Sequence, residues 1–334
     1  MNTVQQKGLA GLLIIIAMVV IVIVIGGSIW YLSTANNLQK QFNPQITLLT
    51  QSGVEKNVLR VGGTIDESGL AADTKEFQPF IDYLVHTLLT RGFPYTKGEF
   101  VGAHSVSEMA QLVREKKIDI IIDSAFPIYV VDTLAGAQVL VDRWKGGVEA
   151  YHSAIFVKEN SPIHTLDDLK GKMLAFDSAT ATTGYFLPKA ELIKQGYTLT
   201  QKTKSTDSCS PKEICYVFVH GNIYESVAKG IIPAGAESEI EIDAYFGETI
   251  HNYRIISRTP DILRFLVATR STMDPNQRNA IKDILLTMHQ TQQERIVLDS
   301  FAKTTKFTTV ATTDTAYGVI KDLTSLVEDE IVQQ

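Results

Sequence analysis

The stretch KMLAFDSATATTGYFLP, residues 172–188, decides the expected fold and function. A short apolar strand, residues 173–176, runs into a loop rich in hydroxyl side chains, and Gly184 then opens a helix. The hydroxyls are those of Ser178, Thr180, Thr182 and Thr183. They lie with free backbone N–H groups at the positive end of that helix. Several hydrogen bonds to a charged acceptor, each worth about 1.5–3 kcal/mol, can hold an oxyanion without a buried lysine or arginine. The loop therefore predicts anion binding rather than catalysis.

Length and composition favour a globular protein with two lobes. The chain has 334 residues, of which 45% are hydrophobic and 20% charged, enough for one large core or two moderate ones. Its formal net charge is −6 and it has no dense cluster of Lys and Arg, so nucleic-acid binding has little electrostatic support. A small anionic ligand is still compatible with this charge, because oriented amides act locally.

Motifs of catalysis and of metal binding do not occur in the sequence. There is no GxSxG, HExxH or Walker motif, and the seven histidines are scattered. We therefore expect no enzyme activity, no metal site and no cofactor.

Residues 1–35 are expected to form a membrane anchor or a signal segment. No charged residue occurs between Leu9 and Leu32, and these 24 residues, at about 1.5 Å each, can cross the ~30 Å hydrocarbon core. The alternative is a cleaved signal peptide with its small-residue site in residues 33–35, but its apolar region is only about 7–15 residues long. An uncleaved transmembrane helix is favoured, and either alternative exports the rest of the chain. The polar residues 36–56 are expected to form a spacer.

The folded part is expected to begin near residue 57 and to alternate strands with helices. Residues 57–150 form the first part of lobe 1, residues 151–255 form lobe 2, and residues 256–334 return to lobe 1 and end in helices. The expected strands are residues 58–64, 95–101, 118–122, 154–157, 173–176, 216–219, 231–236, 253–257 and 265–269. The expected helices are residues 77–88, 107–116, 184–195, 224–229, 275–300 and 315–332. Such alternation predicts an α/β fold with mainly parallel sheets.

The chain is expected to cross between the lobes near residue 150 and again near residues 255–265. Two crossings make a hinge with a cleft between the lobes, where open α/β sheets bind ligands. Ser124 follows an apolar strand whose loop faces this cleft, so its hydroxyl can donate to the ligand. Phe126 or Tyr129 can wall the pocket, although Tyr129 also suits the core.

The two cysteines, Cys209 and Cys215, lie close together in a polar stretch. In an oxidising compartment they can close a small loop, and free thiols are the alternative. Without nearby His or further Cys they do not make a zinc site.

Five segments occur in the order of a known family: LRVGGT, FQPFIDYL, KIDIIIDSAFPIY, RWKGGVEAYHSAIFVK and HGNIYESVAKGIIPAGA. With SPIHTLDDLKGKMLAF and TGYFLPKAEL, they make residues 58–269 resemble the phosphate/phosphite/phosphonate-binding periplasmic solute-binding proteins of ABC importers. The resemblance implies a type II two-lobed periplasmic-binding-protein fold. It also implies capture of a small phosphorus oxyanion and delivery to an ABC permease. Many family members carry Gly-Pro and Tyr where this chain has Asp-Ser-Ala-Phe-Pro, residues 123–127, which suggests an altered specificity.

The resemblance also implies which residues contact the ligand. The family has a Ser-Thr-Ser run before its Gly-Tyr, and the matching positions are Ala181, Thr182 and Thr183 before Gly184. Ala181 lacks the hydroxyl, and Thr180 is near enough to replace it. Thr180, Thr182, Thr183 and Gly184 are therefore expected to bind the oxyanion.

A histidine and an acidic residue complete the set that the resemblance implies. His220 lies ten residues before Gly230, as a histidine does in the family, and it can donate to an oxyanion with a titration near pH 6.5. The acidic or amide position of the family falls at Glu237 or Ser238. A carboxylate there would accept from an amino group or a protonated ligand oxygen and would repel a fully ionised ligand.

Each candidate also has an ordinary structural interpretation. The hydroxyl loop can be a polar helix cap, His220 a surface group, and Glu237 a solvated member of the acidic run 237–243. The run Arg-Trp-Lys, residues 143–145, can close over the cleft or cap the sheet.

We therefore predict a periplasmic or extracytoplasmic receptor for phosphate, phosphite or a phosphonate, tethered to the inner membrane by the N-terminal helix, or secreted if that helix is cleaved. Its partners are a small oxyanion and an ABC permease, with no nucleic acid. The alternative is a membrane-anchored sensing domain that signals through a partner.

Overall fold

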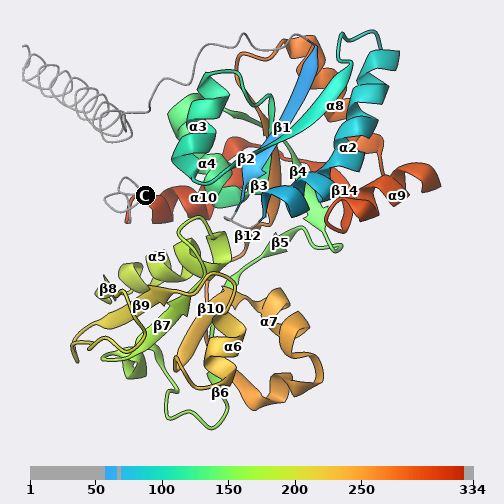
Figure 1. Cartoon of the computed structure of the whole chain (residues 1–334). Helices are drawn as coiled ribbons and strands as arrows, with labels where there is room; N and C mark the ends of the chain where they lie inside the picture. The colour runs from blue at the N-terminus through green and yellow to red at the C-terminus, as the bar shows by residue number, and fades with distance from the viewer. Residues whose placement is uncertain (1–56, 66–68, 327–334) are drawn as a thin grey trace, which may run out of the picture. The chain divides into compact units, whose positions relative to one another are not determined.

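Residues 57–65 and 69–326 are described by a computed structural model, shown in Figure 1. They form two lobes, each built on one six-stranded sheet. The apolar stretch 9–32 and the polar residues 33–56 lie outside the described residues. Within the described ranges, no helix has both the length and the apolar character needed to cross a bilayer.

Lobe 1 contains two separated stretches of the chain. Its elements are β1 (Val58–Thr64), α2 (Leu70–Thr90), β2 (Lys97–Ala103), α3 (Val106–Arg114), β3 (Ile120–Ser124), α4 (Ala125–Ala135), β4 (Gln138–Lys145), β13 (Phe265–Thr269), α8 (Pro275–Thr287), α9 (Gln292–Ser300), β14 (Thr304–Thr309) and α10 (Thr313–Thr324). The strand order is β14-β4-β13-β3-β1-β2. β1 is parallel to β2 and β3, whereas β13 is antiparallel to β3 and β4. The helices α2, α8 and α9 pack an apolar core against one face of this sheet.

Lobe 2 is a continuous stretch. Its elements are β6 (Ser153–Lys158), the 3₁₀ helix η1 (Leu166–Leu169), β7 (Met173–Phe176), the π-helical turn η2 (Thr182–Phe186), α5 (Leu187–Lys194), β8 (Leu199–Gln201), β9 (Ile214–Phe218), α6 (Ile223–Ala228), β10 (Ala234–Ser238), α7 (Glu239–Phe246), the 3₁₀ helix η3 (Gly247–Asn252) and β11 (Tyr253–Arg258). The order β11-β6-β10-β7-β9-β8 places β7, β9 and β10 as parallel neighbours. Apolar clusters cover both faces of this sheet.

Two short strands carry the chain between the lobes, as Figure 1 shows. β5 (Ala150–Tyr151) leaves lobe 1, and β12 (Ile262–Leu263) returns to it. They pair antiparallel with each other, with Tyr151 opposite Ile262. We call this pair the hinge strands.

The expected long helix over residues 275–300 is wrong. α8 ends at Thr287 and α9 begins at Gln292, because Thr291 caps a new helix. The Thr291 hydroxyl accepts the Glu294 N–H at 3.2 Å and donates to the Glu294 carboxylate at 2.7 Å. This reciprocal capping ends one helix and starts another, although the apolar spacing continues through it.

Other expected elements differ mainly at their ends. The helix expected at residues 184–195 begins with the π-helical turn η2, and the C-terminal helix runs from Thr313 to Thr324, with residues 327–332 of the expected helix outside the described part. The sequence analysis missed α4, β4, α7 and β14.

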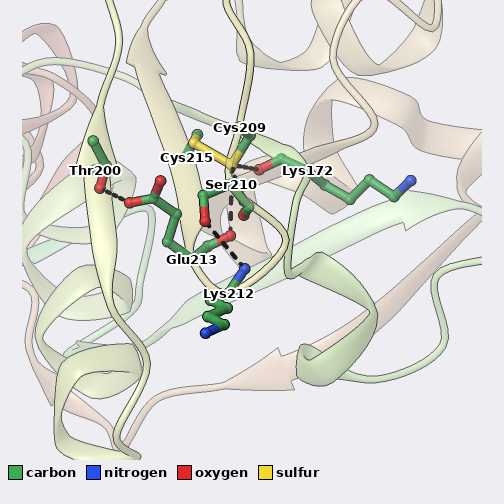
Figure 2. The surroundings of a disulfide bond; sticks show 7 residues. All are labelled: Lys172, Thr200, Cys209, Ser210, Lys212, Glu213 and Cys215. Carbon is green, nitrogen blue, oxygen red and sulfur yellow. Dashed lines mark hydrogen bonds between the residues drawn. A yellow bond between two sulfur atoms is a disulfide. The ribbon is translucent and has the colours of Figure 1, made fainter.

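Cys209 and Cys215 form a disulfide, which confirms one of the two alternatives (Figure 2). Cys215 is a buried residue of β9, and the disulfide ties the loop 209–213 to the start of that strand. Beside it, the Thr200 hydroxyl of β8 donates to the Glu213 carboxylate. The disulfide and this hydrogen bond tie the loop to the edge of the lobe 2 sheet.

Candidate functional site

The lobe 1 side of the site is built around the buried carboxylate of Asp123, near the end of β3. One oxygen, Oδ2, accepts from the Thr64 N–H and the Thr64 hydroxyl, both at 2.7 Å. The other accepts from the Ser124 N–H at 2.7 Å and from the Ser124 hydroxyl at 3.2 Å. These groups meet because β1 and β3 are parallel neighbours that end together. Burial raises the pKa of Asp123, against the lowering effect of its hydrogen bonds.

The lobe 2 side is the π-helical turn η2, which follows the hydroxyl-rich loop. The Phe186 N–H donates to the carbonyl of Ala181 at 3.0 Å, five residues back, and this widens the turn. Thr182 and Thr183 are both buried in it. Such single π turns occur often at functional sites, because they re-aim side chains within a helix.

Thr183 connects this turn to the end of β10. Its hydroxyl donates to Glu237 Oε1 at 2.6 Å, and the Ser238 N–H donates to the same oxygen at 2.6 Å. Glu237 is buried, and burial raises its pKa to about 7, with the nearby Glu241 charge adding to the rise. The carboxyl group is therefore poised to hold or release a proton near neutral pH.

Gly184 is needed where the turn approaches Glu237. A Cβ atom at this position would lie 2.8 Å from Glu237 Oε2 and 2.7 Å from Asp177 Cβ, closer than such atoms come. Glycine therefore lets the turn and the carboxylate pack against each other.

Two contacts join the lobes at this point. Ser124 Oγ lies 2.8 Å from Thr182 Oγ1, and the rings of Phe126 and Phe186 stack with their centroids 4.0 Å apart. Both residues of lobe 1 lie where β3 passes into α4, and both residues of lobe 2 belong to η2. The two candidate hydroxyls therefore face each other across the boundary between the lobes.

The structure brings together most of the candidates, but not all. Ser124 meets Thr182, Thr183 meets Glu237, and Gly184 packs beside Glu237. The Thr180 hydroxyl is 3.4 Å from that of Ser178 and makes no hydrogen bond to these five among the described residues.

His220 stands apart from that group. It has a left-handed backbone with φ of 45°, and its N–H donates to the Asp177 carbonyl at 3.0 Å. Its ring is exposed and lies 6.4 Å from that of Phe218, centroid to centroid. A ligand role for His220 stays a prediction.

Two buried groups were missed by the sequence reasoning. Asp123 was noted only as a neighbour of Ser124, and its role as an acceptor for four donors depends on Thr64, which lies 59 residues away. Tyr151, on the hinge strand β5, is buried too, and burial with the charges of Glu237 and Glu241 raises its pKa. No local sequence pattern predicts the burial of these two side chains, because it depends on contacts between distant strands.

Open hollows lie elsewhere in the described part. One of about 250 Å³ is lined by the hinge strand β12 and the start of α10, and one of about 490 Å³ by the start of β4 and residues 310–312. The candidate residues instead fill the lobe boundary with their own contacts. The two lobes are thus in direct contact here, and the hydroxyls of Ser124, Thr182 and Thr183 make hydrogen bonds within the protein.

A family model for the ABC-transporter phosphonate periplasmic substrate-binding protein matches residues 71–317. The chain belongs to this family. This family membership identifies a solute-binding protein of an ABC transporter and implies an extracytoplasmic location, a small ligand and a permease partner.

Solved structures of related proteins have the same fold. XAC2383 from Xanthomonas citri, in structures bound to chloride ion and to ATP, is 25% identical, with TM-scores of 0.74 and 0.73; the match covers 82% of this chain and 98% of that one. A binding protein component of an ABC phosphonate transporter from Pseudomonas aeruginosa is 15% identical, with a TM-score of 0.61, over 84% of this chain and 90% of that one. PhnD1 from Prochlorococcus marinus, in complex with methylphosphonate, is 15% identical, with a TM-score of 0.60, over 81% of this chain and 98% of that one.

Proposed function

We propose that this binding protein captures a small phosphorus oxyanion, namely phosphate, phosphite or a phosphonate, between its lobes for ABC import. One observation carries the proposal: the hydroxyls of Ser124 and Thr182, from opposite lobes, are 2.8 Å apart. A hydroxyl can rotate to donate to a new acceptor, so an oxygen placed between these two can receive a hydrogen bond from each lobe. A ligand held in this way stabilises the closed arrangement.

Glu237 gives the site a means to choose among anions. Its carboxyl group already accepts from Thr183 and Ser238, and its pKa is near 7. When ionised, it can accept a hydrogen bond from a protonated ligand oxygen, and it repels a ligand that has no proton to give. Part of the phosphate, phosphite or phosphonate in solution carries such a proton near neutral pH, whereas sulfate and sulfonates do not. We therefore expect phosphorus oxyanions to be preferred over their sulfur counterparts.

The comparisons support the same ligand class. PhnD1, which shares the fold, is in complex with methylphosphonate, and XAC2383 is bound to ATP, which carries phosphoryl groups. Ser124, Thr182, Thr183, Gly184 and Glu237 form the proposed ligand seat, with Thr180 and His220 as further candidates that must move to reach it.

The test is calorimetric titration of the full chain in detergent. Phosphate, phosphite and methylphosphonate are the ligands, and sulfate and methanesulfonate are controls of matched shape. Binding of at least one phosphorus oxyanion, with its sulfur counterpart clearly weaker, supports the proposal. Absence of binding by all three phosphorus oxyanions contradicts it, and preference for a sulfur oxyanion contradicts the role of Glu237.

We also propose that the apolar residues 9–32 tether this protein to the inner membrane, because they are long enough to span it. Mass spectrometry of the protein from isolated membranes tests this, since an intact N-terminus supports the tether and cleavage near residue 35 contradicts it. Co-purification distinguishes import from signalling: permease subunits support the first, and a signalling partner without a permease supports the second.

A further inference from the structure

Three cationic side chains lie near the ligand seat, at the end of β4 and beside the hinge strands. They are Arg143, Lys145 and Arg264, which we call the basic cluster. Phe265 of β13 is paired with Ser124 on one side and with Arg143 on the other. Residues directly opposite across neighbouring strands share one face, so Arg143 is two strand spacings, roughly 10 Å, from Ser124.

Arg143 is a buried charge with neutral hydrogen-bond partners. Only 2% of its surface is exposed. Its guanidinium donates to the Thr304 hydroxyl at 2.8 Å and to the carbonyls of Phe301 and Ala302 at 3.4 and 3.3 Å. It also lies over the rings of Phe301 and Phe265, at 4.2 and 4.9 Å from their centroids. Among the described residues no carboxylate forms an ion pair with it.

Carboxylates also act on Arg143, but without touching it. Burial lowers the pKa of its guanidinium to about 9, so it stays charged at neutral pH. Glu76 and Asp123 act on it only through space, and Asp123 is already held by Thr64 and Ser124. A buried charge without a carboxylate in contact is costly, and an anionic ligand nearby lowers that cost.

Lys145 and Arg264 extend the basic cluster toward lobe 2, where Glu241 acts on both. The Lys145 ammonium is 5.4 Å from the centroid of the Phe265 ring and, within the described ranges, makes no hydrogen bond or ion pair. Buried Arg264 donates to the Lys145 carbonyl at 2.9 Å and pairs with Glu241 of α7 at 3.0 Å. Within the part of the chain that the structure describes, its Nε has no hydrogen-bond partner, and the three cations form one ion pair between them.

We propose that the basic cluster is a second anionic subsite, which binds the far end of a ligand whose phosphoryl or phosphonyl group occupies the seat at Ser124 and Thr182. The ligand class is a phosphonate or phosphate ester that carries a second anionic group. Lys145 makes the main contact, since its ammonium can turn toward an incoming oxygen, and Arg143 and Arg264 supply the field. The Phe265 ring lies between the two subsites and can support an apolar linker. This inference rests on the proposed function.

The test compares two series of ligands on the full chain. One series is unbranched alkylphosphonates, and the other has the same alkyl chains with a terminal carboxylate. The lengths reach and pass the ~10 Å between Ser124 and Arg143, because Lys145 lies two residues beyond Arg143 on β4. We expect the carboxylate to tighten binding about tenfold at a matching length, because a partly buried ion pair gains energy in a low dielectric. The gain should disappear in Lys145→Met while the affinity for plain alkylphosphonates changes by no more than about twofold.

Lys306→Met is the matched control. Its ammonium lies 3.6 Å from the centroid of the Trp144 ring, and Lys306 is paired in the sheet with Trp144, the neighbour of Lys145. The change in net charge is the same, so the carboxylate gain should persist in this variant.

The outcomes separate the subsite from the proposed function. The subsite is wrong if alkylphosphonates bind but a terminal carboxylate does not tighten binding at any length. It is also wrong if Lys306→Met removes the gain in affinity as fully as Lys145→Met does. In both cases the proposed oxyanion seat is unaffected. If methylphosphonate, phosphate and phosphite all fail to bind, the proposed function is wrong, and the subsite falls with it.

Discussion

Ser124 Oγ lies 2.8 Å from Thr182 Oγ1, and this hydrogen bond joins the end of β3 in lobe 1 to the first residue of η2 in lobe 2. The stacked rings of Phe126 and Phe186 lie beside it, with centroids 4.0 Å apart. The closed arrangement therefore has a polar and an apolar contact, each made by residues next to the ligand seat. In the function proposed above, a ligand exchanges the polar contact for its own hydrogen bonds and leaves the ring stack in place.

The first prediction concerns this bridge. We expect each of Ser124→Ala and Thr182→Val to lower the unfolding free energy of the unliganded protein. The double variant should lose less than the sum of the two single losses. The coupling should be about 0.5–1.5 kcal/mol, the net value of one hydrogen bond. Chemical denaturation of the four proteins in a double-mutant cycle measures it. Strictly additive effects would show that the bridge contributes nothing in solution.

The second prediction concerns the protonation of Glu237. Burial raises its pKa from 4.5 to about 7, so the folded protein holds the proton more tightly than the unfolded chain. Its contribution to stability therefore falls as the pH rises from about 4.5 through about 7, and is constant above that. We expect Glu237→Gln to be more stable than the wild type at pH 8, by at most about 3 kcal/mol, and the difference to vanish near pH 4.

Glu225→Gln is the control for this pH dependence. Glu225 is exposed on α6 and pairs with Lys229. Thermal unfolding of the three proteins across the pH range is the measurement. An advantage of Glu237→Gln that is equally large at pH 4 and pH 8 would rule out proton uptake by Glu237.

Strands that are bounded by turn residues or polar residues could be predicted from the sequence, whereas some helices could not. β7 and β13 have the expected bounds, because short apolar runs there end at polar residues or turns. α4 was missed because residues 125–131 are buried on nearly every side and show no helical alternation. The expected helix 275–300 failed for the opposite reason, since its apolar spacing continues across the cap at Thr291.

The site could be predicted as a set of residue types but not as a set of contacts. The hydroxyl loop before Gly184 is local, and so is the turn that it forms. The pairing of Thr183 with Glu237 joins positions 54 residues apart, and it depends on β10 lying beside β7 in the sheet. For residues 143–145 the sequence left two interpretations open, because the place of Arg143 opposite Phe265 comes from an antiparallel pairing with a distant strand.

The third prediction concerns Gly184. In Gly184→Ala the added methyl group would meet Glu237 and Asp177 at under 3 Å, so η2 or the carboxylate must shift. We expect a loss of about 1–3 kcal/mol in unfolding free energy, and weaker oxyanion binding. Gly318→Ala is the control, because a Cβ there meets nothing within 4 Å and lies inside α10. That variant should gain up to about 1 kcal/mol. Equal effects of the two substitutions would contradict the packing argument.

The fourth prediction concerns the disulfide of Cys209 with Cys215 (Figure 2). It closes a short loop, so its removal should cost only about 2 kcal/mol. We expect the double variant Cys209→Ala, Cys215→Ala to melt a few degrees below the wild type and to keep its oxyanion affinity, because the loop lies at the β8 and β9 edge of lobe 2, away from β10. Melting temperatures with and without a reducing agent measure this. A large loss of affinity would show that the loop supports the site.

The last prediction concerns His152, which lies between β5 and β6 and holds the hinge to α7. Its Nδ1 lies 2.7 Å from Asp261 beside β12, and its Nε2 lies 2.7 Å from Glu239, which also pairs with Arg258 at 2.6 Å. Glu239 is two residues beyond Glu237, so this cluster connects the hinge to the ligand seat. Partial burial disfavours the imidazolium, but the two carboxylates outweigh it and raise the pKa of His152.

A histidine with a raised pKa stabilises the folded state fully below its ordinary pKa of about 6.5, and that contribution is lost as the pH rises through the raised value. We therefore expect the unfolding free energy to fall as the pH rises above about 6.5, and oxyanion affinity to fall with it. His152→Asn should flatten this part of both profiles. His251→Asn is the control, because the exposed His251 ring has no carboxylate partner among the described residues and its Nδ1 lies 2.8 Å from the Glu248 carbonyl. Unfolding and titration at several pH values measure both, and a slope that survives in His152→Asn would assign the pH dependence to Glu237 or another group instead.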